Sequence, residues 1–114
     1  MIIKRGDVVL TSPEPVKGSE QGKTRPCLVV QNDLGNRASP VTIVAAITSK
    51  AGKEYPFTVQ VKSGEGGLPK DSIVLLNQLR TVSTEHRILK KIGSLKPGTM
   101  KKVNEALKTS LALE

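Results

Sequence analysis

One arginine in this chain stands where it could act on an anion. Residues 18–26 read GSEQGKTRP, so a polar, glycine-punctuated segment runs directly into the apolar run that begins at Cys27. Arg25 lies at this junction, and Pro26 restricts the backbone immediately after it. A guanidinium held in place stays charged and can pair with phosphate or carboxylate oxygens through two parallel hydrogen bonds. Arg25 is therefore a candidate for anion binding, the alternative being an ordinary surface salt bridge.

Hydroxyl and amide groups follow two of the apolar segments. Thr48 ends the most apolar segment, residues 41–48, and Asn77 and Gln78 follow another, residues 72–76. Strand ends are where a rigid scaffold presents functional side chains. Each of these residues also suits an ordinary strand end, so the residues alone indicate only a basic domain that could bind an anion.

The chain has few groups for metal or covalent chemistry. Cys27 and His86 are its only cysteine and histidine. A single cysteine excludes a disulfide within the chain, and two soft ligands are too few for a dedicated zinc site. Cys27 suits a buried strand and His86 an exposed or capping position in a polar turn. With no nucleophile motif or glycine-rich phosphate loop either, we expect no metal and no cofactor.

Length and charge narrow the class of protein. At 114 residues the chain is expected to form one domain over 1–114, and its net charge of +8 favours an anionic partner. Nucleic acid, an acidic protein segment or a membrane surface would fit, and so would a merely soluble basic surface. No apolar run reaches the roughly 18–20 residues of a membrane helix, and the start lacks a signal-peptide core. We therefore expect a cytoplasmic protein.

The apolar patterns predict a mainly β fold. β-branched content and alternation predict strands over residues 6–12, 27–30, 41–48, 57–62, 72–78 and part of 88–95. Residues 79–82 would continue or bend the fifth of these strands. Turn residues predict loops over 13–22, 33–40 and 63–69, and a short helical turn over 83–87.

The C-terminal segment has a different period. Met100, Val103, Leu107 and Leu111 recur at helical spacing, and Pro97 suits the first turn of a helix. Short strands followed by one amphipathic helix indicate a compact antiparallel barrel or two-sheet fold with a helix packed on it.

Several runs of residues together resemble the MazF/PemK toxins of bacterial toxin–antitoxin pairs. The GSEQG loop with its following Arg-Pro is the most specific. The other runs are KRGDV at 4–8, QNDLGNR at 31–37, VAAIT at 44–48 and DSIVLLNQLRT at 71–81. The similarity covers the chain in the right order. Family members often carry aromatics after Gly-Asp-Val, where this chain has Val9 and Leu10.

The resemblance implies an SH3-like β-barrel of the CcdB/MazF/PemK type with a C-terminal helix, assembled as a homodimer. It implies a ribosome- and metal-independent, sequence-specific endoribonuclease that cuts single-stranded mRNA and arrests translation. It further implies a cognate acidic, MazE-like antitoxin that binds across the toxin dimer.

The resemblance also assigns residues. The family's catalytic arginine and threonine fall on Arg25 and Thr48. The RNA-contacting positions that carry over, the first four more securely than the last three, are Ser19, Glu20, Gln21, Gln78, Lys4, Arg5 and Asn32.

The implied chemistry suits these residues. RNA is cut when its 2′-OH attacks the adjacent phosphate, which leaves 2′,3′-cyclic phosphate and 5′-OH ends. Arg25 can stabilise charge on the phosphorane, and Thr48 can donate a hydrogen bond to it. Neither is a suitable general base at neutral pH. Glu20 could take the 2′-OH proton, although recognition of an RNA base is its rival role.

Aromatic residues are nearly absent. Tyr55 and Phe57 are the only ones, so we expect RNA readout by polar groups, with Tyr55 either stacking on a base or packing in a loop. Two other functions remain open: a gyrase poison of the CcdB kind, and an RNA- or peptide-binding barrel without catalysis. The arginine–threonine pair with its loop favours the ribonuclease.

Overall fold

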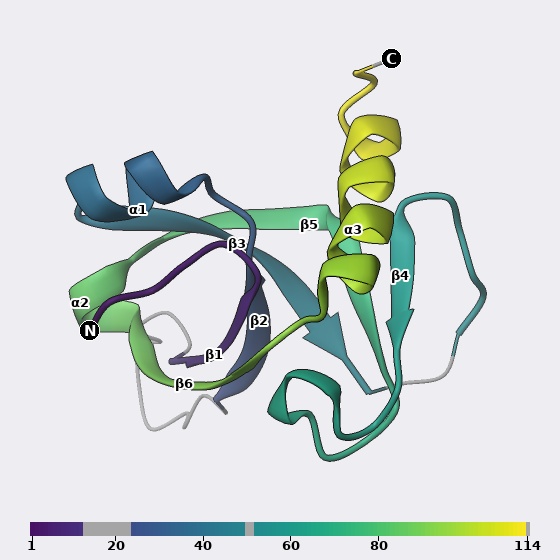
Figure 1. The fold of residues 1–114 in the computed structure, drawn as a ribbon, viewed down its shortest axis with the longest axis horizontal. Helices are drawn as coiled ribbons and strands as arrows, with labels where there is room; N and C mark the ends of the chain where they lie inside the picture. Colours follow the sequence, from purple (N-terminus) through teal and green to yellow (C-terminus); the bar gives the residue numbers. More distant parts are fainter. Residues whose placement is uncertain (13–23, 50–51, 114) are drawn as a thin grey trace, which may run out of the picture.

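A computed structural model describes residues 1–12, 24–49 and 52–113. Six strands form one antiparallel sheet in the order β4-β5-β3-β2-β1-β6 (Figure 1). Their bounds are β1 Asp7–Thr11, β2 Arg25–Val29, β3 Val41–Thr48, β4 Thr58–Val61, β5 Ser72–Ser83 and β6 Ile88–Ser94. One helix, α3, follows at the C-terminal end. The mainly β fold with a C-terminal helix is therefore confirmed.

The segment after β4 joins the two edges of the sheet. It contains a short 3₁₀ helix, η1 (Glu65–Gly67), which lies against β6 and β1. Gly67 has a φ of +75°, and a Cβ there would meet the carbonyl oxygen of Ile92. Glycine is needed where backbones approach this closely. This contact closes the curled sheet in the manner of a barrel. The predicted loop over 63–69 is confirmed, with the single turn of η1 inside it.

The two faces of the sheet carry different cores. Strand pairing places Val8 opposite Leu28 on one face and Val9 opposite Cys27 on the other. The first face packs under α3 with twelve buried residues: Val8, Leu28, Ala45, Ile47, Val59, Val61, Leu68, Val74, Leu76, Leu95, Val103 and Ala106. The second has a smaller cluster of Ile3, Val9, Cys27, Val29, Val44, Val82 and Ile88. Among the described residues, the cluster on the second face is thus the smaller of the two.

Helix α3 runs from Pro97 to Ser110 and begins, as expected, with proline in its first turn. Val103 and Ala106 are buried against the sheet, and Met100 and Leu107 pack beside them. Leu111 was expected on this face but is 51% exposed. The helix ends one residue earlier, so Leu111 forms its C-cap and turns away from the core.

Residues 33–40 do not form the predicted loop. They contain a short helix, α1 (Asp33–Ala38), and the side chain of Asn32 accepts a hydrogen bond of 2.7 Å from the backbone N–H of Gly35. Asparagine is a strong N-cap and Asp33 suits a helix's first turn. The same Leu-Gly-Asn residues that suggested a turn lie inside this helix. The predicted helical turn over 83–87 is confirmed as α2 (Thr84–Arg87), capped by Ser83.

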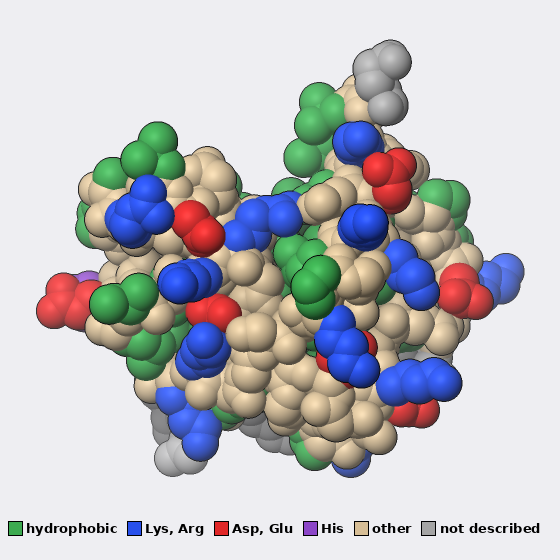
Figure 2. Space-filling view, viewed as in Figure 1, with side chains coloured by type: hydrophobic (Ala, Val, Ile, Leu, Met, Phe, Trp, Pro, Cys, Tyr) green, Lys and Arg blue, Asp and Glu red, His purple; other side chains and the backbone are tan. Residues whose placement is uncertain are grey.

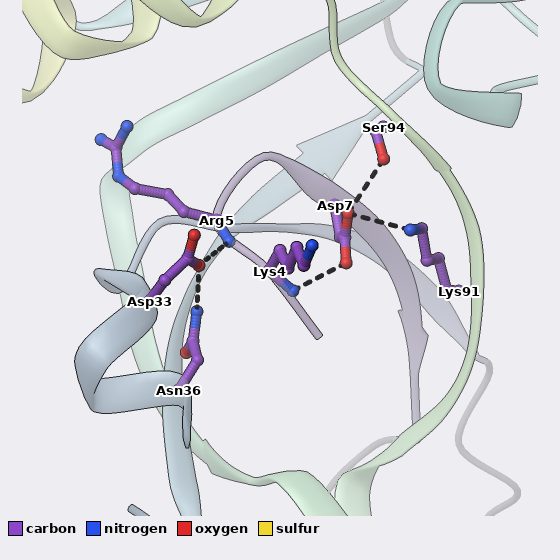
Figure 3. Close-up of polar contacts among 7 residues, drawn as sticks. All are labelled: Lys4, Arg5, Asp7, Asp33, Asn36, Lys91 and Ser94. Atoms are coloured by element: carbon purple, nitrogen blue, oxygen red, sulfur yellow. Dashed lines mark hydrogen bonds and ion pairs between the residues drawn. The ribbon is translucent and has the colours of Figure 1, made fainter. Parts of the chain in front are cut away.

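A buried carboxylate anchors the start of the chain (Figure 3). Asp7 is 3% exposed and accepts hydrogen bonds from the Lys4 backbone N–H at 2.8 Å and the Ser94 hydroxyl at 2.9 Å. Lys91 Nζ lies 3.3 Å from the same carboxylate. A buried charge is tolerated when it is paired and hydrogen-bonded in this way. The Gly-Asp pair near the N-terminus therefore joins β1 to β6.

Candidate active site

Strand register brings Arg25 and Thr48 together. Cys27 of β2 pairs with Ala46 of β3. Extending this antiparallel register by two residues places Arg25 across from Thr48 on the same face. Residues directly opposite in such a pair have Cβ atoms about 4.5–5.5 Å apart. The register thus predicts that the two residues lie side by side, on the face that carries the second cluster.

A cleft opens on this face. Its volume is about 1110 Å³, and Arg25, Thr48 and Gln78 all line it. Gln78 reaches it through an irregularity in β5, where Ala45 pairs with Leu79 but Ala46 pairs with Leu75. Residues 76–78 are therefore extra in β5. Beyond them the strand runs on to Ser83, so the alternative in which residues 79–82 continue the strand is confirmed.

The walls of the cleft are cationic. Besides Arg25, the residues Lys53, Arg80 and Arg87 line it, and no Asp or Glu does so among the described residues. Sequence reasoning missed these three cations. Arg80 lies beyond the bulge, which shifts the alternation of β5, and Arg87 comes from α2, so no local pattern pointed to either.

Arg87 also fastens α2 to the end of β1. Its Nε and Nη2 donate hydrogen bonds of 2.9 and 2.7 Å to the Ser12 carbonyl oxygen. The Ser12 backbone N–H donates in return to the Arg87 carbonyl at 2.8 Å. Several bonds between the same two residues orient a long side chain that would otherwise have many rotamers. The Arg87 guanidinium is thereby held at the cleft wall.

Cys27 forms part of the floor and is buried, as expected. Burial raises the pKa of its thiol, opposed by the Thr11 hydroxyl, at 3.5 Å from Sγ, and by the positive charges of Arg80, Arg87 and Arg25. A neutral thiol is neither a nucleophile nor a base. Cys27 and the three arginines line the same cleft.

Lys4, Arg5 and Asn32 lie elsewhere in the part of the chain that the structure describes. None of them lines the cleft. Arg5 donates from Nε to the Val30 carbonyl and from Nη2 to Asn104 Oδ1, both at 2.8 Å. Asn32 caps α1, as described above.

Three predicted RNA contacts cannot be placed. Ser19, Glu20 and Gln21 fall outside the described residues. Within the described ranges there is no group of three or more His, Cys, Asp or Glu side chains that could hold a metal ion. Within residues 1–12, 24–49 and 52–113, no helix is long and apolar enough to cross a membrane.

Comparison with known proteins decides the family. Residues 4–111 match the model of the PemK-like, MazF-like toxins of type II toxin–antitoxin systems. The chain belongs to this family. It is 50% identical over 114 residues to Endoribonuclease EndoA of Bacillus subtilis, with 99% of this chain and 97% of the relative covered. It is 44% identical over 113 residues to Endoribonuclease MazF of Staphylococcus saprophyticus, covering 98% and 93%. The resemblance to MazF/PemK toxins is thus confirmed.

Solved structures agree on the MazF fold. The chain superposes with a TM-score of 0.83 on a chain of the MazE–MazF crystal structure from Deinococcus radiodurans, covering 100% of this chain and 99% of that one. Sequence identity there is 23%, so this likeness concerns the fold. The expected MazF-type barrel with its C-terminal helix is confirmed.

Proposed function

We propose that this chain is the toxin of a type II toxin–antitoxin system and that it cuts single-stranded RNA in the cationic cleft. The observation that carries the proposal is the placement of Arg25 beside Thr48 within walls formed by three further cations. RNA binding depends on neutralising phosphates, and an arginine pairs with phosphate bidentately. The high identity to two endoribonucleases supports the same activity.

Arg25 and Thr48 would act on the scissile phosphate. As the 2′ oxygen bonds to phosphorus, negative charge grows on the other phosphate oxygens and the bond to the 5′ oxygen breaks. Arg25 stabilises this charge, and the Thr48 hydroxyl donates one further hydrogen bond. The products are a 2′,3′-cyclic phosphate and a 5′-OH, and no cofactor takes part.

The proton transfers need another group. The 2′-OH must lose a proton and the leaving 5′ oxygen must gain one. No carboxylate and no histidine lines the cleft among the described residues, and Cys27 is a buried neutral thiol. Glu20 is the carboxylate nearest to Arg25 along the sequence, so we assign it the role of general base. Its rival role is recognition of an RNA nucleobase.

The toxin works in the cytoplasm as a homodimer of one domain over residues 1–114, and an acidic MazE-like antitoxin silences it. One matched structure is a MazE–MazF complex, and a +8 chain suits an acidic partner. The residues proposed to bind RNA are Ser19, Gln21, Gln78, Asn32, Arg5 and Lys4.

The test is cleavage of a long natural RNA in the presence of EDTA by the wild type and by Arg25→Ala. Discrete cuts with 5′-OH ends are expected, and they should slow by about 10²–10³-fold in the variant. Arg37→Ala is the matched control, since Arg37 is an exposed arginine on α1 outside the cleft.

Three outcomes would contradict the proposal. Products with 5′-phosphates would refute attack by the 2′-OH. Intact RNA that still binds would indicate a binding module without catalysis. Inhibition of gyrase without RNA cleavage would support poisoning of the CcdB kind.

A further inference from the structure

The two aromatic residues of the chain lie in one place. The chain has one tyrosine, one phenylalanine and no tryptophan. Tyr55 and Phe57 both line the cleft that holds Arg25 and Thr48. Both core clusters are otherwise built from aliphatic side chains and Cys27. The aromatic surface of the chain therefore lies at the cleft and outside both core clusters.

The two rings form a stack with an exposed member. Their centroids lie 5.0 Å apart and their planes differ by 5°. Phe57 is half-buried, whereas Tyr55 is 48% exposed. An offset stack has two outer faces, and the buried partner occupies only one face of Tyr55. The tyrosine therefore carries an apolar, flat surface that water covers in the free protein.

A tight turn holds the stack in place. The Thr58 backbone N–H and hydroxyl both donate to the Tyr55 carbonyl at 3.0 Å, and Thr58 Oγ1 accepts from the Tyr55 N–H at 3.0 Å. Pro56 stands between the two aromatics, at a turn position where its fixed φ is favoured. A ring that is already oriented loses little conformational entropy when it binds a flat ligand.

We propose that Tyr55, backed by Phe57, is the stacking platform for one RNA base next to the cleavage site. This rests on the proposed ribonuclease activity. Base–aromatic stacking tolerates any base, because every base has a π face. β5 lies between β3 and β4, so β4 is about two strand spacings, roughly 10 Å, from the strand of Thr48. Thr48 is level with Gln60 through Ile73, and Tyr55 precedes Gln60 by five residues, so Tyr55 is also displaced along the strands. The stacked base therefore lies farther along the cleft than the cleaved bond, and Tyr55 does not touch the reacting atoms.

The probe for the test is a synthetic single-stranded RNA. It carries the recognition sequence mapped from the 5′-OH ends of the products. The nucleotide whose 2′-OH would attack has a 2′-deoxy sugar, so the RNA cannot be cut. A matched series has an abasic site at each flanking position in turn. Because Tyr55 is the only tyrosine, its ring resonances in an NMR spectrum of the full-length protein report on this one residue.

Stacking predicts two results in this experiment. The Tyr55 ring protons shift upfield when the probe binds, and one abasic probe alone fails to shift them. Tyr55→Ala raises the dissociation constant about tenfold for every probe except that one. Tyr55→Phe restores tight binding, whereas Tyr55→Leu does not, since it is apolar without a π face. Leu34→Ala removes an exposed apolar side chain of α1 outside the cleft and serves as the control.

Other results would overturn the inference. If Tyr55→Leu binds as tightly as Tyr55→Phe, the ring is a packing residue. If the probe shifts resonances around Arg25 but leaves the Tyr55 ring unchanged, the base stacks elsewhere and only this inference fails. If the probe shifts no resonance of the cleft, the proposed function fails and the stacking platform fails with it.

Discussion

At the scale of single residues, the proposed mechanism separates charge stabilisation from proton transfer. Arg25 and Thr48 offer a permanent cation and a neutral hydroxyl, and neither exchanges protons readily at neutral pH. The buried thiol of Cys27 lies beneath them and stays protonated. Arg25 and Thr48 therefore suit a phosphate that gains charge, and in the proposed mechanism the proton travels through a different group.

The contribution of the Thr48 hydroxyl to RNA cleavage can be tested by replacing the hydroxyl with a methyl group. Thr48→Val keeps the shape of the side chain, and we expect cleavage of the mapped RNA to slow about 10- to 100-fold, because a hydrogen bond to a charged group is lost. Thr48→Ser should keep most of the activity. Single-turnover rates at saturating enzyme measure both.

Thr81→Val is the control for this change, since Thr81 is an exposed β5 threonine outside the cleft. Equal rates for the wild type and Thr48→Val would remove the hydroxyl from the mechanism.

At the scale of elements, local capping and strand pairing explain where the predicted RNA contacts lie. The bulge in β5 presents Gln78 to the cleft, while the Asn32 side chain already satisfies a helix end. Asn32 therefore has a structural role that does not depend on RNA. Serine can cap a helix but has no side-chain amide, so it would replace Asn32 as a cap and not as an RNA contact.

Substitution of Asn32 separates these roles. Asn32→Ala should lower the free energy of unfolding by about 1 kcal/mol, because an N-cap is lost, and Asn32→Ser should restore it. Denaturant unfolding measures the stability, and binding of the uncuttable RNA measures the contact. If both variants bind RNA as the wild type does, Asn32 is a cap alone. Weak binding by the stable Asn32→Ser variant would instead support the proposed RNA contact.

At the scale of the whole molecule, charge is spread widely but the cleft concentrates one sign. Figure 2 shows Lys and Arg scattered over one face, with Asp and Glu among them. The net charge of +8 favours approach of a polyanion from many directions. In the cleft the described charged lining residues are all cationic, so we expect the bound strand to follow its walls.

Salt dependence tests this path. For single-stranded RNA the logarithm of affinity should fall with the logarithm of salt concentration by about 0.7 for each phosphate neutralised. Arg80→Gln removes one cation of the cleft wall and should lower this slope by about 0.7. Lys62→Gln removes an exposed lysine outside the cleft and should leave it unchanged. An unchanged slope in Arg80→Gln would show that the strand does not contact that wall.

The sequence by itself determined the strands, the C-terminal helix and the family. These features depend on local patterns: alternation for strands, helical spacing around Val103, and the GSEQGKTRP run that ends beside Pro26. Arg25 and Thr48 could be found because Arg25 precedes one apolar segment and Thr48 ends another. The helix α1 could also have been found, since Asn32 and Asp33 form an N-cap signal that the turn residues after them obscured.

Only the tertiary structure decided which residues share the cleft. The register of β2 on β3 places Arg25 beside Thr48, and the β5 bulge shifts the alternation so that Gln78 and Arg80 both reach the cleft. Tyr55 joins them because β4 pairs beside β5. Sequence spacing carries none of this, because strand order and bulges depend on the packing of residues that lie far apart along the chain. The arginine at the end of the GSEQG loop was thus visible in the sequence, whereas the walls around it came from folding.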